Sequence, residues 1–599
     1  MATIARSLCI GVVVLAGAVE CAAEPLFTSP NISGSISEGS NIGYDLTPDG
    51  RYVLFTADDD DMIAGDTNGM LDLIIRDRMT NTNELITPGV SLGTRVPSAG
   101  ECLGAMSADG RYVVFQSVYN VIPGVADRGA QQIYVRDRVL QQTFLISRND
   151  AGEPLEADSL FPTISDDGRY VAFISAAASI AQGEEGTRTY LVDRQSGARR
   201  IVSRNRGGDT LNIVGNGPRP FMSGDGRWIV FATSPLLPEA GQTTHVYLYD
   251  RNDDSLKIIS RTPAGDLGSG PSNNAVISRD GRYIAFVSAA PNLTGQPVGD
   301  EQVLRLNRVT GAIDKVEFDR LGNQLSNGTF DPPVVTSLSA TGRYLAFASS
   351  KRLIAGIPPF LIGGGFVRDM ESSRSVVANV DRLGRRVASG GPLTEDGRFV
   401  MMAGSDAMFP QSLSVPNSKL GSSAASGDVF LEDLSAVDVS VRLVETTTRS
   451  IVDAVVENHS TLQASLVALH LTSSPAVPVG VATPDVCDAN LLPRDCWNIF
   501  LAAGQQVTVH LPFNLNQVAT AVDLDVVLEP NEVDPNLANN SAHFTIAAPP
   551  APPPPPSNSG GGGSGGGGGA FGWVSAALLL SLRAVSSRRR RRLDTSHVL

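Results

Sequence analysis

The sequence predicts an all-β protein, with a seven-bladed β-propeller followed by a β-sandwich domain. Three observations support this fold class. A motif centred on Asp-Gly-Arg-aromatic occurs seven times, and its glycines lie 55 to 61 residues apart. The 599-residue chain contains 60 glycines and 37 prolines, which suits short strands joined by turns. Residues 436–547 lack the motif but still show alternating apolar and polar positions, as expected for further strands.

The seven copies of the motif align without gaps. In each copy a Ser or Thr comes first, and the glycine is followed by Arg and then by an aromatic residue. The copies are TPDGRYVLF (Thr47–Phe55), SADGRYVVF (Ser107–Phe115), SDDGRYVAF (Ser165–Phe173), SGDGRWIVF (Ser223–Phe231), SRDGRYIAF (Ser278–Phe286), SATGRYLAF (Ser339–Phe347) and TEDGRFVMM (Thr394–Met402).

Each copy has the parts of a four-stranded blade. A short apolar segment precedes Asp-Gly, which predicts a hairpin turn because glycine accepts a positive φ at little cost. An alternating strand follows, then a third strand ending in Asp, as in Ile75–Arg78, and then a fourth strand. A fixed period indicates a repeat architecture, and four strands per unit favour a propeller. The rival is a linear stack, which usually has shorter repeats and special capping units.

The chain also indicates how the ring closes. The third strand of the seventh copy is Val429–Asp433, and no clear fourth strand follows it. Before the first copy, Pro25–Ser29 has the composition of an orphan fourth strand. We therefore predict that this N-terminal strand completes the seventh blade, which would remove the exposed sheet edges.

Over residues 24–435 this pattern resembles the PD40, or TolB-like (WD40-like), family of β-propellers. The segment Ala64–Gly69, followed by Asp72, is similar to the blade sequences of extracellular members. The sixth copy departs from the pattern with Thr341 in place of Asp, and the fifth has Asn307 at the third-strand Asp position. The resemblance implies the propeller fold for this region.

The arginines of the motif have two interpretations. Seven equivalent cations could form a ring for an anionic ligand, or each could pair with the third-strand Asp of its own blade. We favour the second, because a functional group is needed once whereas this residue recurs with every hairpin. The aromatic residue that follows is expected to pack between sheets. The arginines are Arg51, Arg111, Arg169, Arg227, Arg282, Arg343 and Arg398.

Residues 436–547 predict a β-sandwich of six or seven strands. The stretch Leu528–Pro535, followed by Asn539 and Asn540, resembles the end of CARDB-type, Ig-like bacterial adhesion modules, which act as stalks or spacers. The predicted strands are Val437–Glu445, Ile451–Glu457, Ser465–Leu471, Gln506–Pro512, Ala521–Glu529 and Ala542–Ile546.

The N-terminus predicts export. Residues 1–23 have Arg6, an apolar stretch and small residues before Glu24, which is the pattern of a signal peptide cleaved after Ala23. A lipidated Cys21 is the alternative.

The C-terminus carries a second targeting pattern. A Pro/Gly-rich linker spans residues 548–569, and residues 570–599 hold an apolar segment and the basic run Arg588–Arg592. This arrangement resembles the GlyGly-CTERM sorting signal, which a rhomboid-type protease (rhombosortase) cuts in Gram-negative bacteria. A plain membrane anchor is the alternative. Both place the folded part at the cell surface, in the outer membrane or outside the cell, and only this segment would contact a membrane.

Few residues suggest metal or redox chemistry. Asp66, Asn68 and Asp72 lie in an acidic stretch that could hold Ca²⁺, although no bidentate Glu stands at the spacing of a calcium loop. A solvated acidic loop is the alternative, and no other cofactor is expected. Cys487 and Cys496 are expected to form a local disulfide in an oxidising compartment. Zinc is disfavoured because no CxxC or HxxxH spacing accompanies them.

The predicted function is binding or scaffolding by a monomer, with a protein or glycan partner at the cell surface. The net charge of −15 argues against nucleic acid. Motifs of hydrolases and nucleotide enzymes are absent, and His245 is the only propeller histidine. The alternative is a secreted polysaccharide lyase or hydrolase with its site in the central funnel. Polar side chains meeting at the axis would favour a ligand site, whereas an apolar plug would exclude the enzyme. Unrepeated loops between blades are expected to carry recognition.

Overall fold

The computed structural model describes the strands of both domains and many of their connections. The described residues are 26–27, 42–57, 62–63, 72–87, 104–118, 121–126, 128–180, 187–203, 219–241, 243–295, 300–318, 333–349, 364–377, 390–404, 428–433, 437–446, 451–460, 464–476, 494–501, 504–513, 520–529 and 534–548. The predicted signal peptide and the C-terminal segment lie outside these ranges. None of the helices in these ranges has the length and hydropathy of a membrane span.

Seven antiparallel sheets of four strands each form the first domain. Blades one to three are β2 (Ile42–Leu46), β3 (Tyr52–Ala57), β4 (Asp72–Asp77) and β5 (Thr82–Leu85); β6 (Gly104–Met106), β7 (Tyr112–Ser117), β8 (Gln132–Asp137) and β9 (Gln142–Leu145); and β10 (Ser159–Ile164), β11 (Tyr170–Ser175), β12 (Arg188–Asp193) and β13 (Arg199–Ile201).

The remaining blades repeat this order. Blades four to seven are β14 (Phe221–Met222), β15 (Trp228–Thr233), β16 (His245–Asp250) and β17 (Ser255–Ile258); β18 (Ser272–Ile277), β19 (Tyr283–Ser288), β20 (Gln302–Asn307) and β21 (Ile313–Lys315); β22 (Val334–Leu338), β23 (Tyr344–Ser349), β24 (Gly364–Asp369) and β25 (Arg374–Val377); and β26 (Gly390–Leu393), β27 (Phe399–Gly404), β28 (Asp428–Asp433) and β1 (Leu26–Phe27).

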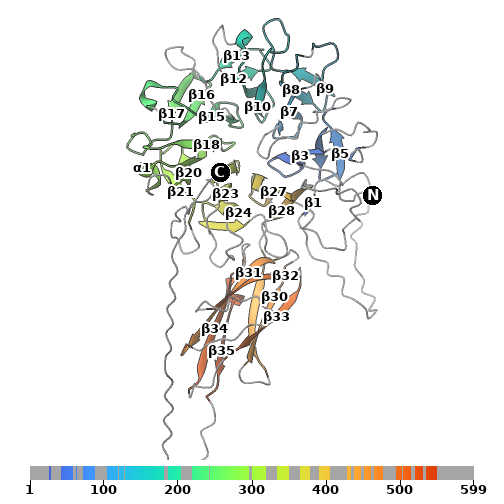
Figure 1. Ribbon diagram of the computed structural model, residues 1–599. Helices are drawn as coiled ribbons and strands as arrows, with labels where there is room; N and C mark the ends of the chain where they lie inside the picture. Colours follow the sequence, from blue (N-terminus) through green and yellow to red (C-terminus); the bar gives the residue numbers. More distant parts are fainter. Residues whose placement is uncertain are drawn as a thin grey trace, which may run out of the picture. The chain divides into compact units, whose positions relative to one another are not determined.

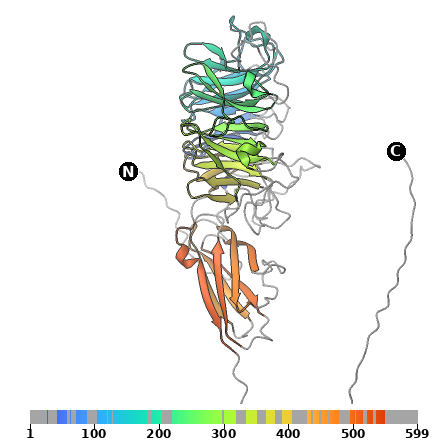
Figure 2. The ribbon, with the colours of Figure 1, turned by 90° about the vertical axis from the view of Figure 1, so that its left-hand side faces the viewer.

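The blades form a closed ring. The first strand of each blade contacts the first strand of the next, in the order β2, β6, β10, β14, β18, β22, β26 and back to β2. Figure 1 shows the ring with the fourth strands, such as β17 and β21, at the rim, and Figure 2 shows the same disc edge-on. The seven-bladed propeller is therefore confirmed, and the linear stack is excluded.

The N-terminal strand closes the ring as predicted. β1 pairs with β28 in antiparallel register, with Leu26 opposite Leu431 and Phe27 opposite Phe430. The seventh blade thus combines three strands from the end of the propeller with one from its start. This pairing covers the outer edge of β28, which would otherwise present free backbone donors and acceptors.

Hydrophobic clusters lie between neighbouring blades. One cluster joins Leu54 and Ile75 of blade one to Val113 and Phe115 of blade two, and comparable clusters join blades two to three, three to four, four to five, five to six and seven to one. The middle strands are buried on both faces, which explains their continuous apolar runs. Packing between sheets, rather than within one sheet, therefore holds the ring together.

The second domain is a β-sandwich. One sheet has the order β29-β30-β33, the other has the order β32-β31-β34-β35, and one apolar core includes residues of both. The strands are β29 (Val439–Glu445), β30 (Ile451–Asn458), β31 (Ala464–Ser474), β32 (Arg494–Leu501), β33 (Gln506–Pro512), β34 (Val522–Glu529) and β35 (Ser541–Ile546).

β32 is absent from the predicted strands. Its backbone places Cys496 opposite Leu469 of β31, so this cysteine lies in a strand that the sequence analysis did not predict. Two register shifts in this pairing break the alternation on which the prediction depended. Cys487 lies outside the described residues, so the disulfide stays a prediction.

We expect the closing strand to be needed for stability. A mature chain that lacks Leu26 and Phe27 loses the pairing with β28, and the loss of about two backbone hydrogen bonds should cost about 1–3 kcal/mol. Thermal unfolding and light scattering would show a lower midpoint and more self-association. A chain truncated after Ala548 is the matched control. An unchanged midpoint in the N-terminal deletion would contradict this role of β1.

Candidate functional site

The hairpin of each motif is held by a short hydrogen-bond network. In blade two the Ser107 hydroxyl donates to Asp109 Oδ1 at 2.6 Å, and the backbone N–H of Arg111 donates to the same oxygen at 2.9 Å. The N–H of Tyr112 donates to Ser107 Oγ at 2.9 Å. Gly110 supplies the positive φ of +69° that the turn requires. The motif therefore encodes its own turn, and we call the end of the ring that carries these turns the hairpin face.

Blade six shows which part of this network is dispensable. Thr341 replaces the Asp, yet the N–H of Tyr344 still donates to Ser339 Oγ at 3.0 Å, and Gly342 keeps a φ of +68°. The serine and the glycine therefore suffice for the turn.

The repeated arginines pair with aspartates of their own blades, which confirms the structural interpretation in five blades. The pairs are Arg51–Asp77, Arg111–Asp137, Arg169–Asp193, Arg227–Asp250 and Arg343–Asp369, with nitrogen–oxygen distances of 2.7 to 2.8 Å. The Arg51 guanidinium lowers the pKa of Asp77 to about 2. These five arginines are therefore held in ion pairs within their own blades, and they do not form a ring of cations that is available to a ligand.

Blade five shows what happens when the acid is missing. Asn307 Oδ1 accepts the N–H groups of Val309 and Thr310, as the aspartates do in other blades. Arg282 has no carboxylate partner among the described residues, and its guanidinium lies 5.3 Å from the ring centre of Tyr283. The amide thus preserves the turn between the third and fourth strands but not the ion pair.

The aromatic residue of the motif connects neighbouring blades. Tyr112 of blade two lies between the guanidinium of Arg111, 4.8 Å away, and that of Arg194 from blade three, 4.7 Å away. Arg194 also donates to the carbonyl oxygen of Gly168, and a Cβ on Gly168 would collide with the Tyr112 ring. We call this contact of an aromatic ring with the next blade's glycine and arginine the inter-blade lock. It recurs as Tyr52 with Gly110 and Arg138, Tyr170 with Gly226 and Arg251, and Trp228 with Gly281 and Arg308.

The lock between blades five and six is built differently. Met370 stands where blades one to five have the arginine that follows the third-strand Asp or Asn. Arg305, from the third strand of blade five, fills this place. Its guanidinium lies 4.4 Å from the Tyr283 ring centre and donates to the Gly342 carbonyl oxygen at 2.7 Å. The carboxylate of Asp314 forms an ion pair with Arg305, with a nitrogen–oxygen distance of 2.6 Å. A cation is therefore kept at this interface by a different residue.

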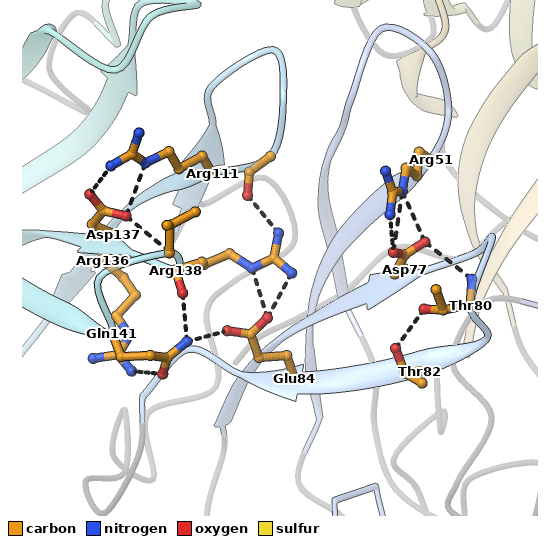
Figure 3. A network of polar contacts seen from close by, with 12 residues as sticks. Arg51, Asp77, Thr80, Thr82, Glu84, Arg111, Arg136, Asp137, Arg138 and Gln141 are labelled. Atoms are coloured by element: carbon orange, nitrogen blue, oxygen red, sulfur yellow. Dashed lines mark hydrogen bonds and ion pairs between the residues drawn. The ribbon is translucent and has the colours of Figure 1, made fainter.

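Figure 3 shows the polar contacts of the corresponding residues in blades one and two. The Arg51–Asp77 and Arg111–Asp137 pairs lie at equivalent places in the two blades. Arg138 of blade two also forms an ion pair with Glu84 of blade one, with a nitrogen–oxygen distance of 2.6 Å, and so joins the two blades. Because these groups bind one another, an incoming ligand would have to break existing contacts.

Unlike the repeated residues, the position after the first Ser or Thr of the motif varies. Backbone hydrogen bonds link these positions around the axis: Asp166 N–H donates to the Gly224 carbonyl, and Gly224 N–H donates to the Arg279 carbonyl, both at 2.8 Å. The side chains of Asp166 in blade three and Arg279 in blade five form an ion pair across blade four. A Cβ on Gly224 would collide with the Asp166 carboxylate. The small residue in blade four therefore makes room for the ion pair.

Asp45 adds a carboxylate from blade one. It lies in β2 beside a register shift, and it accepts the N–H of Leu46 at 2.9 Å and that of Met106 at 2.7 Å. Burial raises the pKa of Asp45, whereas the positive charges of Arg279 and Arg219 lower it. Asp45 of blade one thus interacts electrostatically with arginines of blades five and four. We call Asp45, Asp166, Arg219 and Arg279 the axial cluster.

The axial cluster was missed in the sequence, although a signal was present. Pro48, Ala108, Asp166, Gly224, Arg279, Ala340 and Glu395 occupy one position of an otherwise repeated motif. Such a position is free of the packing role that constrains its neighbours. Polar side chains from different blades therefore come together near the axis, which is the outcome that favours a ligand site. Asp166 and Arg279 belong to the motif, whereas Asp45 and Arg219 precede it.

The predicted calcium ligands are only partly described. Asp72 lies in β4, is 1% exposed, and accepts a hydrogen bond from the Thr87 hydroxyl at 3.0 Å. Asp66 and Asn68 lie outside the described residues. Among the residues that the structure describes, no group of three or more His, Cys, Asp or Glu side chains is arranged to hold a metal ion. The calcium site therefore stays a prediction.

His245 has a structural environment. Its ring nitrogens lie 3.0 Å from Ser260 Oγ and 3.1 Å from the Ala240 carbonyl oxygen, and burial lowers its pKa. Both partners belong to the surroundings of blade four, so this histidine is not part of the axial cluster.

Comparisons with known proteins find distant likenesses of fold. No family model and no curated protein matches the chain. Among solved structures, an oligogalacturonate lyase from Vibrio parahaemolyticus is 12% identical, with a TM-score of 0.39, over 69% of this chain and 91% of that one. TolB from Acinetobacter baumannii is 16% identical, with a TM-score of 0.29, over 56% of this chain and 71% of that one. An acylaminoacyl peptidase from Pyrococcus horikoshii is 10% identical, with a TM-score of 0.38, over 71% of this chain and 59% of that one. Likenesses this distant assign no activity.

The substituted lock between blades five and six can be tested by exchange. Arg305→Met should destabilise the propeller by about 1–3 kcal/mol, because the Gly342 carbonyl loses its charged donor. Adding Met370→Arg to that variant should restore most of the loss, since it returns the cation to the place that blades one to five use. Urea unfolding of the two variants and the parent would measure both effects. Failure of the second substitution to recover any stability would contradict the exchange.

Proposed function

We propose that this chain is an exported binding module that recognises a protein partner through the hairpin face of its propeller, with the sandwich as a spacer. The axial cluster is the observation that carries this proposal. Its four charged side chains come from blades one, three, four and five, so they give a nearly symmetric ring one asymmetric charged centre. Recognition requires such asymmetry, because seven equivalent hairpins present seven equivalent surfaces.

Exposed apolar side chains on the same face favour a protein over a glycan. Val139 and Leu140 are 69% and 55% exposed, Met79 is 79% exposed and Val309 is 68% exposed. All four lie in turns between third and fourth strands, within three residues of the aspartate or asparagine that ends the third strand. Exposed apolar side chains beside charged groups are typical of protein interfaces. We call these four residues the apolar rim.

The contacts of the axial cluster argue against the alternative of a polysaccharide lyase or hydrolase. Such chemistry needs an acid and a base that are free to move protons at the substrate. Both carboxylate oxygens of Asp45 accept backbone N–H groups, and Asp166 is paired with Arg279. The propeller's one histidine, His245, is buried elsewhere. Binding is therefore the function that these residues support best.

Export is part of the proposal. The closing strand β1 begins at Leu26, three residues after the predicted signal cleavage at Ala23. Removal of residues 1–23 would therefore leave ring closure intact. The C-terminal segment would then hold or sort the chain at the cell surface.

The apolar rim provides the test. The parent chain, a Val139→Asp/Leu140→Asp variant and a Val444→Asp/Val527→Asp control, whose substitutions lie on the exposed surface of the sandwich, would each be used to capture proteins from envelope and extracellular fractions of the source bacterium. We expect quantitative mass spectrometry to find a partner that the rim variant binds about tenfold less and that the control retains. Each buried Val or Leu side chain contributes about 1.5–3 kcal/mol, which is tenfold or more.

Two results would contradict this function. One is that no protein is enriched by the parent chain over a blank resin. The other is that the rim variant captures the same proteins to the same extent. Thermal unfolding of all three chains checks that the substitutions leave the fold intact.

A further inference from the structure

Arg219 is the member of the axial cluster whose charge is least satisfied. It lies two residues before β14, the first strand of blade four, and is half-buried. Its guanidinium lies 4.8 Å from the ring centre of Phe221. Within the described part of the chain it has no hydrogen-bond acceptor and no ion-pair partner, although it could donate five N–H groups.

The carboxylates near the axis cannot easily supply that partner. Asp45 feels the charge of Arg219, yet both of its oxygens already accept backbone N–H groups. Asp166 is held by Arg279 across Gly224. Arg219 is therefore the one member of the axial cluster that has no hydrogen-bond or ion-pair partner among the described residues.

We infer that Arg219 binds a carboxylate group of a peptide, an inference that rests on the proposed recognition of a protein partner. The planar guanidinium matches a carboxylate in a bidentate geometry, and the Phe221 ring restricts where its plane can lie. The net charge of −15 opposes phosphate groups and polyanions, so a singly charged group is the best fit. The apolar rim on the same domain favours a peptide over a sugar acid.

Small probes can separate the sources of the carboxylate. N-acetyl-glycylglycine carries a C-terminal carboxylate, and the α-amide of N-acetylglutamate carries a side-chain carboxylate; the fully amidated form of each is its neutral control. Calorimetric titration into the full chain should show binding of at least one acid, with its amide at least about tenfold weaker. A charged hydrogen bond of this kind is commonly worth a factor of ten or more.

A matched pair of variants locates the binding. Arg219→Gln should weaken binding of the acid about tenfold or more. Arg282→Gln should leave it unchanged, because Arg282 also lacks a carboxylate partner among the described residues but lies in a hairpin, stacked on Tyr283. Neither substitution removes a hydrogen bond within the described residues, and unfolding midpoints would verify that both variants fold.

Three outcomes would overturn the inference. The acids could bind no better than their amides, or the two variants could weaken binding equally. Alternatively, glucuronate could bind more tightly than either peptide acid and depend on Arg219, which would identify a sugar ligand. The capture experiment is independent of these results. A partner that is lost with the apolar rim but kept by Arg219→Gln would leave the proposed function in place and remove only this site.

Discussion

The propeller depends above all on the contact between the aromatic ring of one hairpin and the glycine and arginine of the next blade. Glycine is required there for two reasons. The turn needs a positive φ, and a Cβ would enter the neighbouring ring; at Gly110, Gly226, Gly281 and Gly342 that Cβ would lie 2.5 to 2.7 Å from ring or side-chain carbons. The arginine of the next blade then lies over the aromatic ring and donates a hydrogen bond to the carbonyl oxygen of that glycine. One short motif therefore makes the turn and also sets the spacing between blades.

The packing role of the repeated residues limits what they can contribute to function. Residues that pack every blade against the next cannot also distinguish one partner from another. The position after the first Ser or Thr escapes this role, and its backbone is held by the same ring of hydrogen bonds in most blades. Different side chains on a nearly identical backbone then give the axial cluster its ion pair between Asp166 and Arg279. Arg219, which has no ion-pair partner among the described residues, and the exposed apolar rim also differ from blade to blade, so both can distinguish one partner from another.

The sequence predicts the repeated features of this structure well, because repetition is itself the signal. The seven blades, the closing strand and the Arg–Asp pairs follow from the period and from simple pairing. Non-local and irregular features could not be predicted. The electrostatic interaction of Asp45 with Arg219 joins blades one and four, which are far apart in the sequence. Arg305 of blade five takes the place of an arginine that blade six lacks, and β32 pairs through register shifts that break the alternation.

A double-mutant cycle at Tyr112 and Gly168 measures the inter-blade lock most directly. Gly168→Ala should cost the strain of a positive φ, about 1–2 kcal/mol, plus the clash with Tyr112. In a Tyr112→Ala background only the strain should remain, so the two substitutions should couple by about 1 kcal/mol or more. Gly197→Ala, at a φ of +75° with open space around it, calibrates the strain alone. If Gly168→Ala costs the same with and without Tyr112, the lock does not hold neighbouring blades together.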